Sequence, residues 1–167
     1  MLKHILRVAV AIIFIVSGFV KAVDVIGFSF KLEEYFEPPV FNIPSMVDLA
    51  LPLAIFVVGL ELLLGFMLLL RIKLKHTLLA LIALCVFFAF LTFYSAYFNV
   101  VTDCGCFGDA LKLEPWQSFW KDIILLVALC IIYFLYNKDP EKFTDHKSKM
   151  KSMAVFLFSA LMTYIIM

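Results

Sequence analysis

Apolar residues in this 167-residue chain gather into five long stretches separated by short segments that carry most of the charge. The hydrocarbon core of a bilayer is about 30 Å thick, and a helix of about 20 apolar residues crosses it. Lipid offers the backbone no hydrogen-bond partners, so each crossing segment has to be helical. The pattern predicts transmembrane helices over Ile5–Val23, Val47–Leu70, Thr77–Phe98, Phe119–Tyr136 and Met153–Met167.

These stretches predict the fold class and its division into segments. We expect an all-α membrane protein whose four-helix transmembrane bundle occupies residues 1–136. A basic cytoplasmic linker over residues 137–151 then leads to a fifth transmembrane helix over residues 152–167. The fifth stretch is shorter than a full span and stops at Met167 without a polar flank. We therefore expect the natural chain to continue beyond Met167.

The first stretch also resembles a secretory signal peptide, because Lys3 and Arg7 precede its apolar run. However, Lys21 and Asp24 stand where the small residues of a cleavage site belong. The stretch is therefore predicted to remain as a membrane anchor.

Composition agrees with a membrane protein and excludes a soluble domain. Hydrophobic residues make up 65% of the chain, charged residues 16%, and the mean hydropathy is +1.06. Soluble domains have about 45–50% apolar and about 25% charged residues. The formal net charge of +1 gives no basic field for nucleic acid. The expected partner is the lipid bilayer, with no role for nucleic acid.

The positions of the basic residues predict the orientation, because cytoplasmic loops carry the Lys and Arg excess. One side of the membrane receives the N-terminal basic residues, the segment 71–75 and the segment 138–151. The other side receives the acidic segment 24–45 and the segment 99–117. The N terminus is therefore predicted to be cytoplasmic, in the inner membrane of a bacterial cell, with the two longer loops facing the periplasm.

The second outer loop carries the most specific chemistry, in the run Asp103-Cys104-Gly105-Cys106-Phe107-Gly108-Asp109. Disulfides form and persist on the exported side of a membrane. Gly105 permits the backbone angles that so small a ring needs. A strained disulfide is easier to reduce. A disulfide across so short a loop restricts the unfolded chain little, so stability alone is a poor reason for it. We take a redox-active dithiol of Cys104 and Cys106 as the first hypothesis.

Two other hypotheses remain for this loop. The pair can be a structural disulfide that shapes the loop. It can also hold a metal together with Asp103 or Asp109, although metal sites usually recruit three or four ligands and wider cysteine spacing. The two carboxylates disfavour a reactive thiolate, an effect that Lys112 can offset. We expect no metal.

Three of the ionisable residues inside predicted spans stand out. Glu61 lies near the middle of the second span, where a charge costs about 2.5–3.5 kcal/mol and normally has a partner or a task. Lys21 lies about 9 Å further outward, within partial reach, and Asp122 near the outer end of the fourth span can meet the same amine. We expect a buried polar cluster of Lys21, Glu61 and Asp122 beneath the dithiol loop. Either Glu61 carries protons or contacts a quinone ring, or the cluster fixes the register of the helices.

The remaining cysteines and the histidines narrow the chemistry. Cys85 and Cys130 lie within spans and are expected to be small buried hydrophobes. His4, His76 and His146 stand at the cytoplasmic edges, so none can ligate a haem at mid-membrane. We expect neither haem nor metal as a cofactor.

The chain before the second span is predicted to contain two further features. The aromatic segment from Phe28 to Phe36 is expected to anchor at the membrane interface, with a lid over the dithiol as the alternative. Ser45 and Asp48 follow Pro44 in capping-box spacing, which favours a helix start there.

Taken together, these residues resemble the bacterial DoxX/MauE-type redox-associated membrane proteins over about the first 136 residues. The likeness is carried by Ser17-Gly18 followed by Lys21, by Lys31-Leu32 and Tyr35, by Glu61, and most specifically by Cys104-Gly105-Cys106-Phe107-Gly108. The resemblance implies a role in disulfide formation or thiol redox balance of exported proteins beside thioredoxin-like partners. Some larger bacterial relatives look similar through a fifth span and then carry an exported C-terminal domain. A larger membrane complex is a further partner that we consider. A looser likeness to vitamin K epoxide reductase and DsbB implies a quinone acceptor. This chain departs from both in its one-residue cysteine spacing and its lack of a second exported pair.

Two functions therefore compete. The first is a membrane thiol–disulfide oxidoreductase, or its membrane module, in which Cys104 exchanges with an exported thioredoxin-like or other thiol protein and Cys106 resolves the mixed disulfide. The second is a non-catalytic membrane scaffold or assembly subunit, in which a structural loop disulfide helps to dock an exported partner.

Overall fold

The computed structural model of the chain describes residues 2–38, 40–98, 114–137 and 155–156. These residues form helices, turns and bends but no strand, so the all-α prediction is confirmed. Two short helices follow the first long one: α2 (Val25–Phe36) and α3 (Pro44–Val47). The long helices are α1 (Leu2–Val23), α4 (Ala50–Leu69), α5 (Leu74–Phe98) and α6 (Pro115–Asn137).

Within these described ranges, four helices are long and apolar enough to cross a membrane: α1 from Lys3 onward, α4, α5 and α6. The prediction of a multi-pass membrane protein with four spans is thus confirmed. Of the predicted fifth span only Val155 and Phe156 are described, both in helical conformation. The fifth span, the linker before it and the cytoplasmic N terminus stay predictions.

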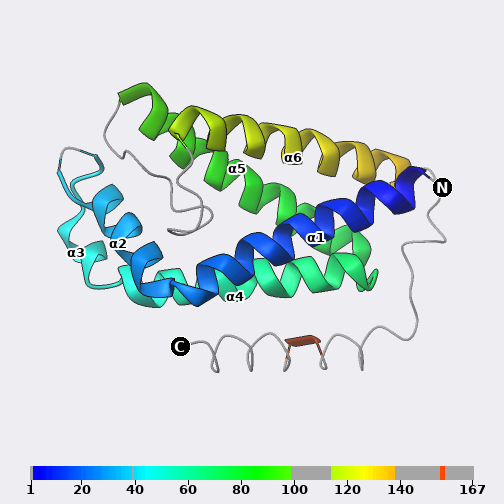
Figure 1. The fold of residues 1–167 in the computed structure, drawn as a ribbon, viewed down its shortest axis with the longest axis horizontal. Coiled ribbons are helices and arrows are strands. Elements are labelled where there is room, and N and C mark those ends of the chain that lie inside the picture. Colours follow the sequence, from blue (N-terminus) through cyan, green and yellow to red (C-terminus); the bar gives the residue numbers. More distant parts are fainter. Residues whose placement is uncertain (1, 39, 99–113, 138–154, 157–167) are drawn as a thin grey trace.

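The four long helices lie side by side and alternate in direction (Figure 1). α1 packs mainly against α4 and α5 mainly against α6, while α4 contacts α5 and α1 contacts α6. The bundle therefore has two ends. The N-terminal end holds the start of α1, the α4–α5 turn and the last residues of α6. The α2 end holds α2, α3, the last turn of α5 and the first turn of α6 (Figure 1).

The bundle places polar side chains inside and large apolar side chains outside. Ile12, Phe56, Val86, Ile124 and Phe134 are each at least 45% exposed on the surface of the long helices. In water this distribution would be unfavourable, but in a bilayer the exposed side chains meet lipid. The polar side chains buried in the described residues are those of Arg7, Ser17, Lys21, Ser29, Glu61, Thr77, Thr92, Ser95, Ser118 and Asp122.

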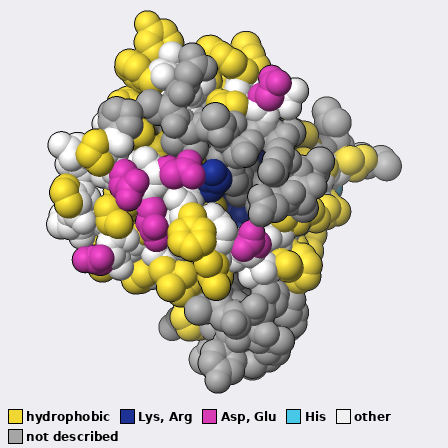
Figure 2. All heavy atoms as spheres, turned by 60° about the vertical axis from the view of Figure 1, so that its left-hand side comes forward, with side chains coloured by type: hydrophobic (Ala, Val, Ile, Leu, Met, Phe, Trp, Pro, Cys, Tyr) yellow, Lys and Arg dark blue, Asp and Glu magenta, His cyan; other side chains and the backbone are white. Residues whose placement is uncertain are grey.

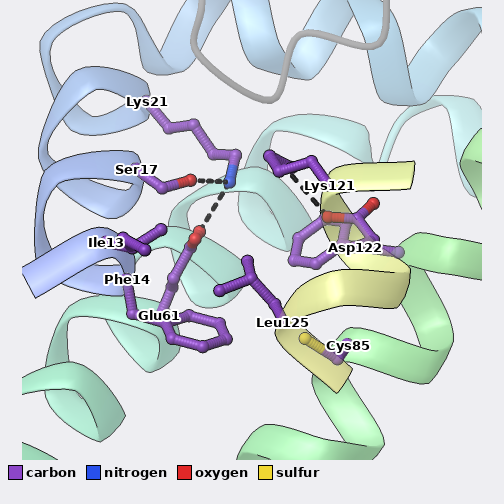
Figure 3. A pocket seen from close by; sticks show the side chains of 10 residues that line it. Ile13, Phe14, Ser17, Lys21, Glu61, Cys85, Lys121, Asp122 and Leu125 are labelled. Atoms are coloured by element: carbon purple, nitrogen blue, oxygen red, sulfur yellow. Dashed lines mark hydrogen bonds and ion pairs between the residues drawn. The ribbon is translucent and has the colours of Figure 1, made fainter. Parts of the chain in front are cut away.

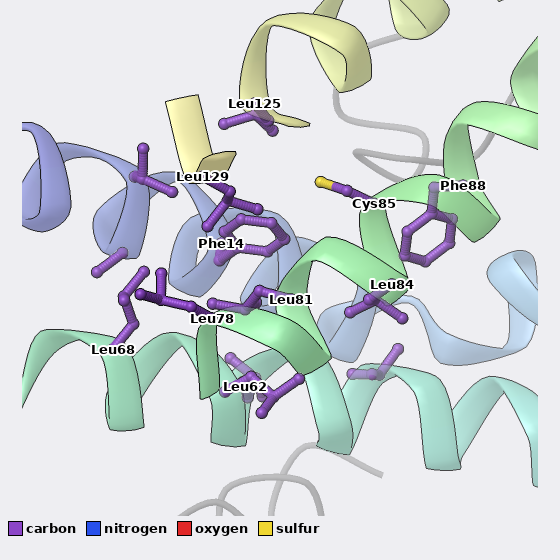
Figure 4. Close-up of a cluster of buried hydrophobic side chains, with 14 of the residues drawn as sticks. Phe14, Leu62, Leu68, Leu78, Leu81, Leu84, Cys85, Phe88, Leu125 and Leu129 are labelled. Carbon is purple, nitrogen blue, oxygen red and sulfur yellow. The ribbon is translucent and has the colours of Figure 1, made fainter. Parts of the chain in front are cut away.

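A continuous apolar core joins the four long helices (Figure 4). Phe14 of α1 and Leu62 of α4 belong to this core together with Leu81 of α5 and Leu129 of α6. Tight packing of such side chains, with helix-to-helix polar contacts, holds membrane helices together because lipid tails are as apolar as the core itself.

Two glycines let α1 and α4 approach closely. A Cβ atom at Gly18 would lie 3.0 Å from Cγ of Leu62, and one at Gly65 would lie 2.9 Å from Cγ1 of Ile15. Small residues at membrane helix interfaces bring backbones together and strengthen van der Waals contact. The expected role of Gly65 in close helix approach fits this contact.

The aromatic segment after α1 packs into the bundle and does not lie only at the membrane interface. It forms α2, whose first turn is capped by Asp24 accepting a hydrogen bond from the Gly27 amide at 2.9 Å. Phe28, Leu32 and Tyr35 are at most 5% exposed, although Phe30 faces outward. The pure anchoring prediction was therefore wrong: the i, i+4, i+7 spacing of Phe28, Leu32 and Tyr35 gives α2 one buried face.

The expected capping box at Ser45 and Asp48 was also wrong. Pro44 opens the separate single turn α3, and α4 begins only at Ala50, with no side-chain capping hydrogen bond at either start. Pro52 explains the break, because in the interior of a longer helix its ring would clash with the carbonyl of Asp48. In the first turn of α4 the missing amide costs nothing.

We predict that Gly18→Leu will weaken the bundle at the α1–α4 contact. The larger side chain has to displace Leu62, and overpacking of this kind typically costs about 1–3 kcal/mol. The free energy of unfolding in micelles measures the effect. Ala9→Leu is the matched control, because Ala9 is exposed on the same helix. Equal stability of the two variants would contradict the close approach.

Candidate functional site: a buried polar cluster

A lysine and a glutamate form an ion pair inside the bundle, within its membrane-spanning part. Nζ of Lys21 lies 2.7 Å from Oε2 of Glu61, joining α1 to α4. The two residues are only 1% and 2% exposed. The amine also donates a hydrogen bond of 3.0 Å to Oγ of Ser17, one turn earlier on α1 (Figure 3).

Aromatic rings complete the surroundings of this amine. Nζ of Lys21 lies 4.8 Å from the ring centre of Phe88 on α5 and 5.7 Å from that of Phe28 on α2. Both distances are within the range of a cation–π interaction. Four elements therefore share one lysine, which compensates its removal from water with a carboxylate, a hydroxyl and two aromatic faces.

A second ion pair lies across from the first, on α6. Nζ of Lys121 is 3.1 Å from Oδ1 of Asp122, and Asp122 is 4% exposed. The hydroxyl of Thr92 on α5 lies 3.4 Å from Oδ2 of Asp122 and also donates to the Phe88 carbonyl at 3.0 Å. The side chain of Lys121 remains 23% exposed, so this pair reaches the surface and the first pair does not.

A small cavity separates the two ion pairs. Its walls include Ser17, Lys21 and Glu61 on one side and Lys121 and Asp122 on the other, with Cys85 nearby (Figure 3). Its volume of about 10 Å³ is close to the minimum for one water molecule. The cavity is much smaller than a quinone ring.

The predicted cluster of Lys21, Glu61 and Asp122 thus lies around one cavity, but the contacts within it differ from the expected ones. The expected contact between Lys21 and Asp122 is not formed, because each group is engaged by another residue. The sequence interpretation missed Lys121 and Thr92. Lys121 could have been identified from the sequence, because it is adjacent to Asp122. Thr92 could not, because it lies on another helix.

The α2 end of the bundle lies above this cluster. Acidic side chains gather around basic ones on this face (Figure 2). The hydroxyls of Tyr35 and Ser95, 2.6 Å apart, tie α2 to α5 here. The acidic residues of this end are Asp24, Glu33, Glu34, Glu37, Asp48 and Glu114.

The four cysteines fall into two groups. Cys85 is buried in α5 and Cys130 is half-buried in α6, both as free thiols. Cys104 and Cys106 lie outside the described residues, in the segment that joins Phe98 to Pro115. Those two flanking residues belong to the α2 end (Figure 1). Within the described ranges, no group of three or more His, Cys, Asp or Glu side chains could hold a metal ion.

Comparison with known proteins gives a family and one relative. The family model described as methylamine utilisation protein MauE matches residues 1–135. The chain is 25% identical over 150 residues to Protein TlpB of Flavobacterium psychrophilum, a match covering 84% of this chain and 39% of that protein. The chain therefore spans about two fifths of the length of this curated relative. No solved structure matches. The MauE part of the resemblance is confirmed, and the DoxX part stays a prediction.

We predict that breaking the buried ion pair will cost far more than replacing it. Lys21→Met or Glu61→Gln alone leaves an uncompensated buried partner and should lower the free energy of unfolding by about 3–5 kcal/mol. The double variant Lys21→Met with Glu61→Leu removes both charges and should recover most of that loss. Unfolding in micelles measures all three.

The matched control is the partly exposed ion pair of Lys31 and Glu34 on α2, which is 2.8 Å long. Lys31→Met should change the free energy of unfolding by about 0–1 kcal/mol, because water screens this pair. If the two single variants of the buried pair were as mild as this control, the pair would not hold α1 against α4.

Proposed function

Since the chain belongs to the MauE family and crosses the membrane several times, we propose that it is a membrane thiol–disulfide oxidoreductase, or the membrane module of one. Its exchanging groups are Cys104 and Cys106. One observation carries the proposal. The other two cysteines, Cys85 and Cys130, lie within transmembrane helices, where a water-soluble partner cannot reach them.

The location of the α5–α6 connection supports the same assignment. α5 ends at Phe98 and α6 begins at Pro115, both at the α2 end, and Cys104 and Cys106 lie between these two residues in the sequence. The opposite end carries the described basic residues Lys3, Arg7, Arg71, Lys73 and Lys75. By the positive-inside rule the basic end faces the cytoplasm. We therefore place the chain in the inner membrane of a bacterial cell, with its dithiol on the periplasmic side.

The exchange follows ordinary thiol–disulfide chemistry. A thiolate of an exported thioredoxin-like protein attacks the sulfur of Cys104 in the Cys104–Cys106 disulfide. The old sulfur–sulfur bond breaks, a mixed disulfide forms, and Cys106 leaves as a thiolate. The second thiolate of the partner then attacks the mixed disulfide. The partner becomes oxidised and both cysteines of this chain become reduced, a transfer of two electrons that runs in reverse with a reduced chain and an oxidised partner.

The buried cluster supports this proposal because it holds together the helices that carry the dithiol segment. The Lys21–Glu61 pair ties α1 to α4, and Asp122 with Thr92 ties α6 to α5. A fixed bundle keeps the ends of α5 and α6, and hence the roots of the dithiol segment, at a constant separation. A proton-relay role for Glu61 stays a prediction.

We assign no quinone to the described cluster. The cavity beside Glu61 holds about one water molecule, and the Glu61 carboxylate is already bound by Lys21. We therefore route no step of the reaction through a quinone. The quinone stays a prediction from the looser resemblance.

We predict that Cys106→Ser will accumulate a mixed disulfide between Cys104 and an oxidised exported partner. In this reverse direction Cys104 attacks the disulfide of the partner, and Cys106 is the resolving thiol that the variant lacks. Cys104→Ser should abolish both the mixed disulfide and the exchange. Non-reducing electrophoresis of membranes after acid quenching detects the adduct. Cys85→Ala and Cys130→Ala are the matched controls and should retain full exchange. The proposal fails if both serine variants oxidise exported thiols as fast as the native chain.

A redox titration of the purified chain separates this enzyme from a scaffold with a structural disulfide. We expect Cys104 and Cys106 to titrate within about −270 to −120 mV, the range of exchangeable protein dithiols. A potential below about −300 mV, typical of structural disulfides, would favour the scaffold. Alkylation of the free thiols followed by mass measurement gives the reduced fraction at each potential.

A further inference from the structure

The outer face of α4 is less exposed than the outer faces of the other long helices. In α1, α5 and α6 an exposed residue recurs at intervals of at most four positions, and Ile12 and Ile124 are 50% and 65% exposed. In α4, no residue from Val57 to Leu69 is exposed. This stretch makes about three and a half turns, and each turn of a helix at the edge of a bundle directs side chains outward. The outer side of α4 is therefore covered.

Helical periodicity identifies the covered face. Glu61 and Gly65 face α1. Leu63 stands two positions from each of them, so it lies on the opposite side of α4, and Leu60 and Met67 share its face at spacings of three and four residues. All three are half-buried. Among the described residues, Leu60 packs against the apolar core, whereas Leu63 and Met67 belong neither to that core nor to the side chains packed against it.

Two described residues of the predicted fifth span point to what covers this face. Val155 is 7% exposed, whereas its neighbour Phe156 is 59% exposed. Both residues are helical, and a helix that touches nothing else does not bury a single valine in this way. Val155 therefore packs against another part of the molecule. Figure 1 shows α4 as the long helix nearest to these two residues.

The length and direction of the chain fit the same face. As a helix, residues 152–167 would be about 24 Å long, enough to cover the stretch from Val57 to Leu69, which is about 20 Å long. α6 ends at Asn137 at the N-terminal end of the bundle, where α4 also ends. A span that starts from this end runs antiparallel to α4.

The sequence of the fifth span is suited to contact with another helix on the side of Val155. In a helix, Ser159 and Thr163 follow Val155 at spacings of four and eight residues. Small and hydroxyl side chains let membrane helices approach closely and strengthen van der Waals contact between them. Lipid tails are as apolar as these helices, so close packing is what favours a helix over lipid on this face.

We propose that the fifth span, residues 152–167, packs as a helix along the outer face of α4 and antiparallel to it, with Leu60, Leu63 and Met67 as its contact surface. The occupant of this surface is the C-terminal segment of the same chain. The contact supports the helix that carries Glu61 from the side opposite to α1. It does not depend on the thiol chemistry of the proposed function.

Photocrosslinking of the full chain in membranes tests this contact. p-Benzoylphenylalanine replaces Leu63 and, in a second variant, Met67, so that a folding defect of one variant does not decide the result. Trypsin cleaves after Lys151, so the whole span belongs to the peptide that begins at Ser152. We expect mass spectrometry to find both probes joined to this peptide. The matched control is the probe at Ile124, on the exposed face of α6, which should give no such adduct.

Mixing the probe-bearing chain with an isotope-labelled chain before reconstitution shows whether an adduct forms within one chain or between two. Adducts within one chain support the proposal. Adducts between labelled and unlabelled chains would show that a second copy covers α4, and would overturn it. Equal yields from Leu63 and Ile124, or no adduct from either Leu63 or Met67, would also overturn it, because the fifth span would then have no preferred position on α4.

Discussion

The buried ion pair between Lys21 and Glu61 is the interaction on which the arrangement of this bundle depends. Inside the membrane-spanning part of the bundle, no water hydrates an ionised side chain. Burial of each charge is compensated because its partner lies 2.7 Å away. The requirement therefore constrains how α1 slides and rotates against α4. Gly18 and Gly65 let the two backbones approach closely enough for the pair to form.

The same rule organises the rest of the bundle. Several buried polar groups find partners on another helix, as Asp122 does with Thr92 and as Tyr35 does with Ser95. Apolar groups face outward as well as inward, because lipid accepts them without cost. Polar contacts, and not apolar burial alone, therefore specify which helix faces which. The ionisable groups occur at three levels: the N-terminal end, the buried cluster and the α2 end.

These levels separate the structural and chemical roles that we propose. The α2 end receives the helices whose connection carries Cys104 and Cys106, over a cluster that holds α1, α4, α5 and α6 in register. The N-terminal end gathers cations around Tyr136. A membrane protein that exchanges thiols with an exported partner needs an accessible dithiol on a stable base. Buried thiols such as Cys85 can then serve as ordinary packing groups.

The amino-acid sequence by itself determined the fold class and the four membrane crossings, because the length of an apolar run and the thickness of a bilayer are enough to predict them. It also identified Lys21, Glu61 and Asp122, since an ionisable group within an apolar run is conspicuous whichever way the helix is rotated in the bundle. Only the tertiary structure decided their partners. Asp122 meets Thr92 and Lys121 and not Lys21, and Arg7 caps α4 and is not a plain interfacial charge. The packed face of α2 and the break before α4 were likewise decided in three dimensions. Contacts between helices depend on their relative rotation and depth, which the periodicity of a single helix does not contain.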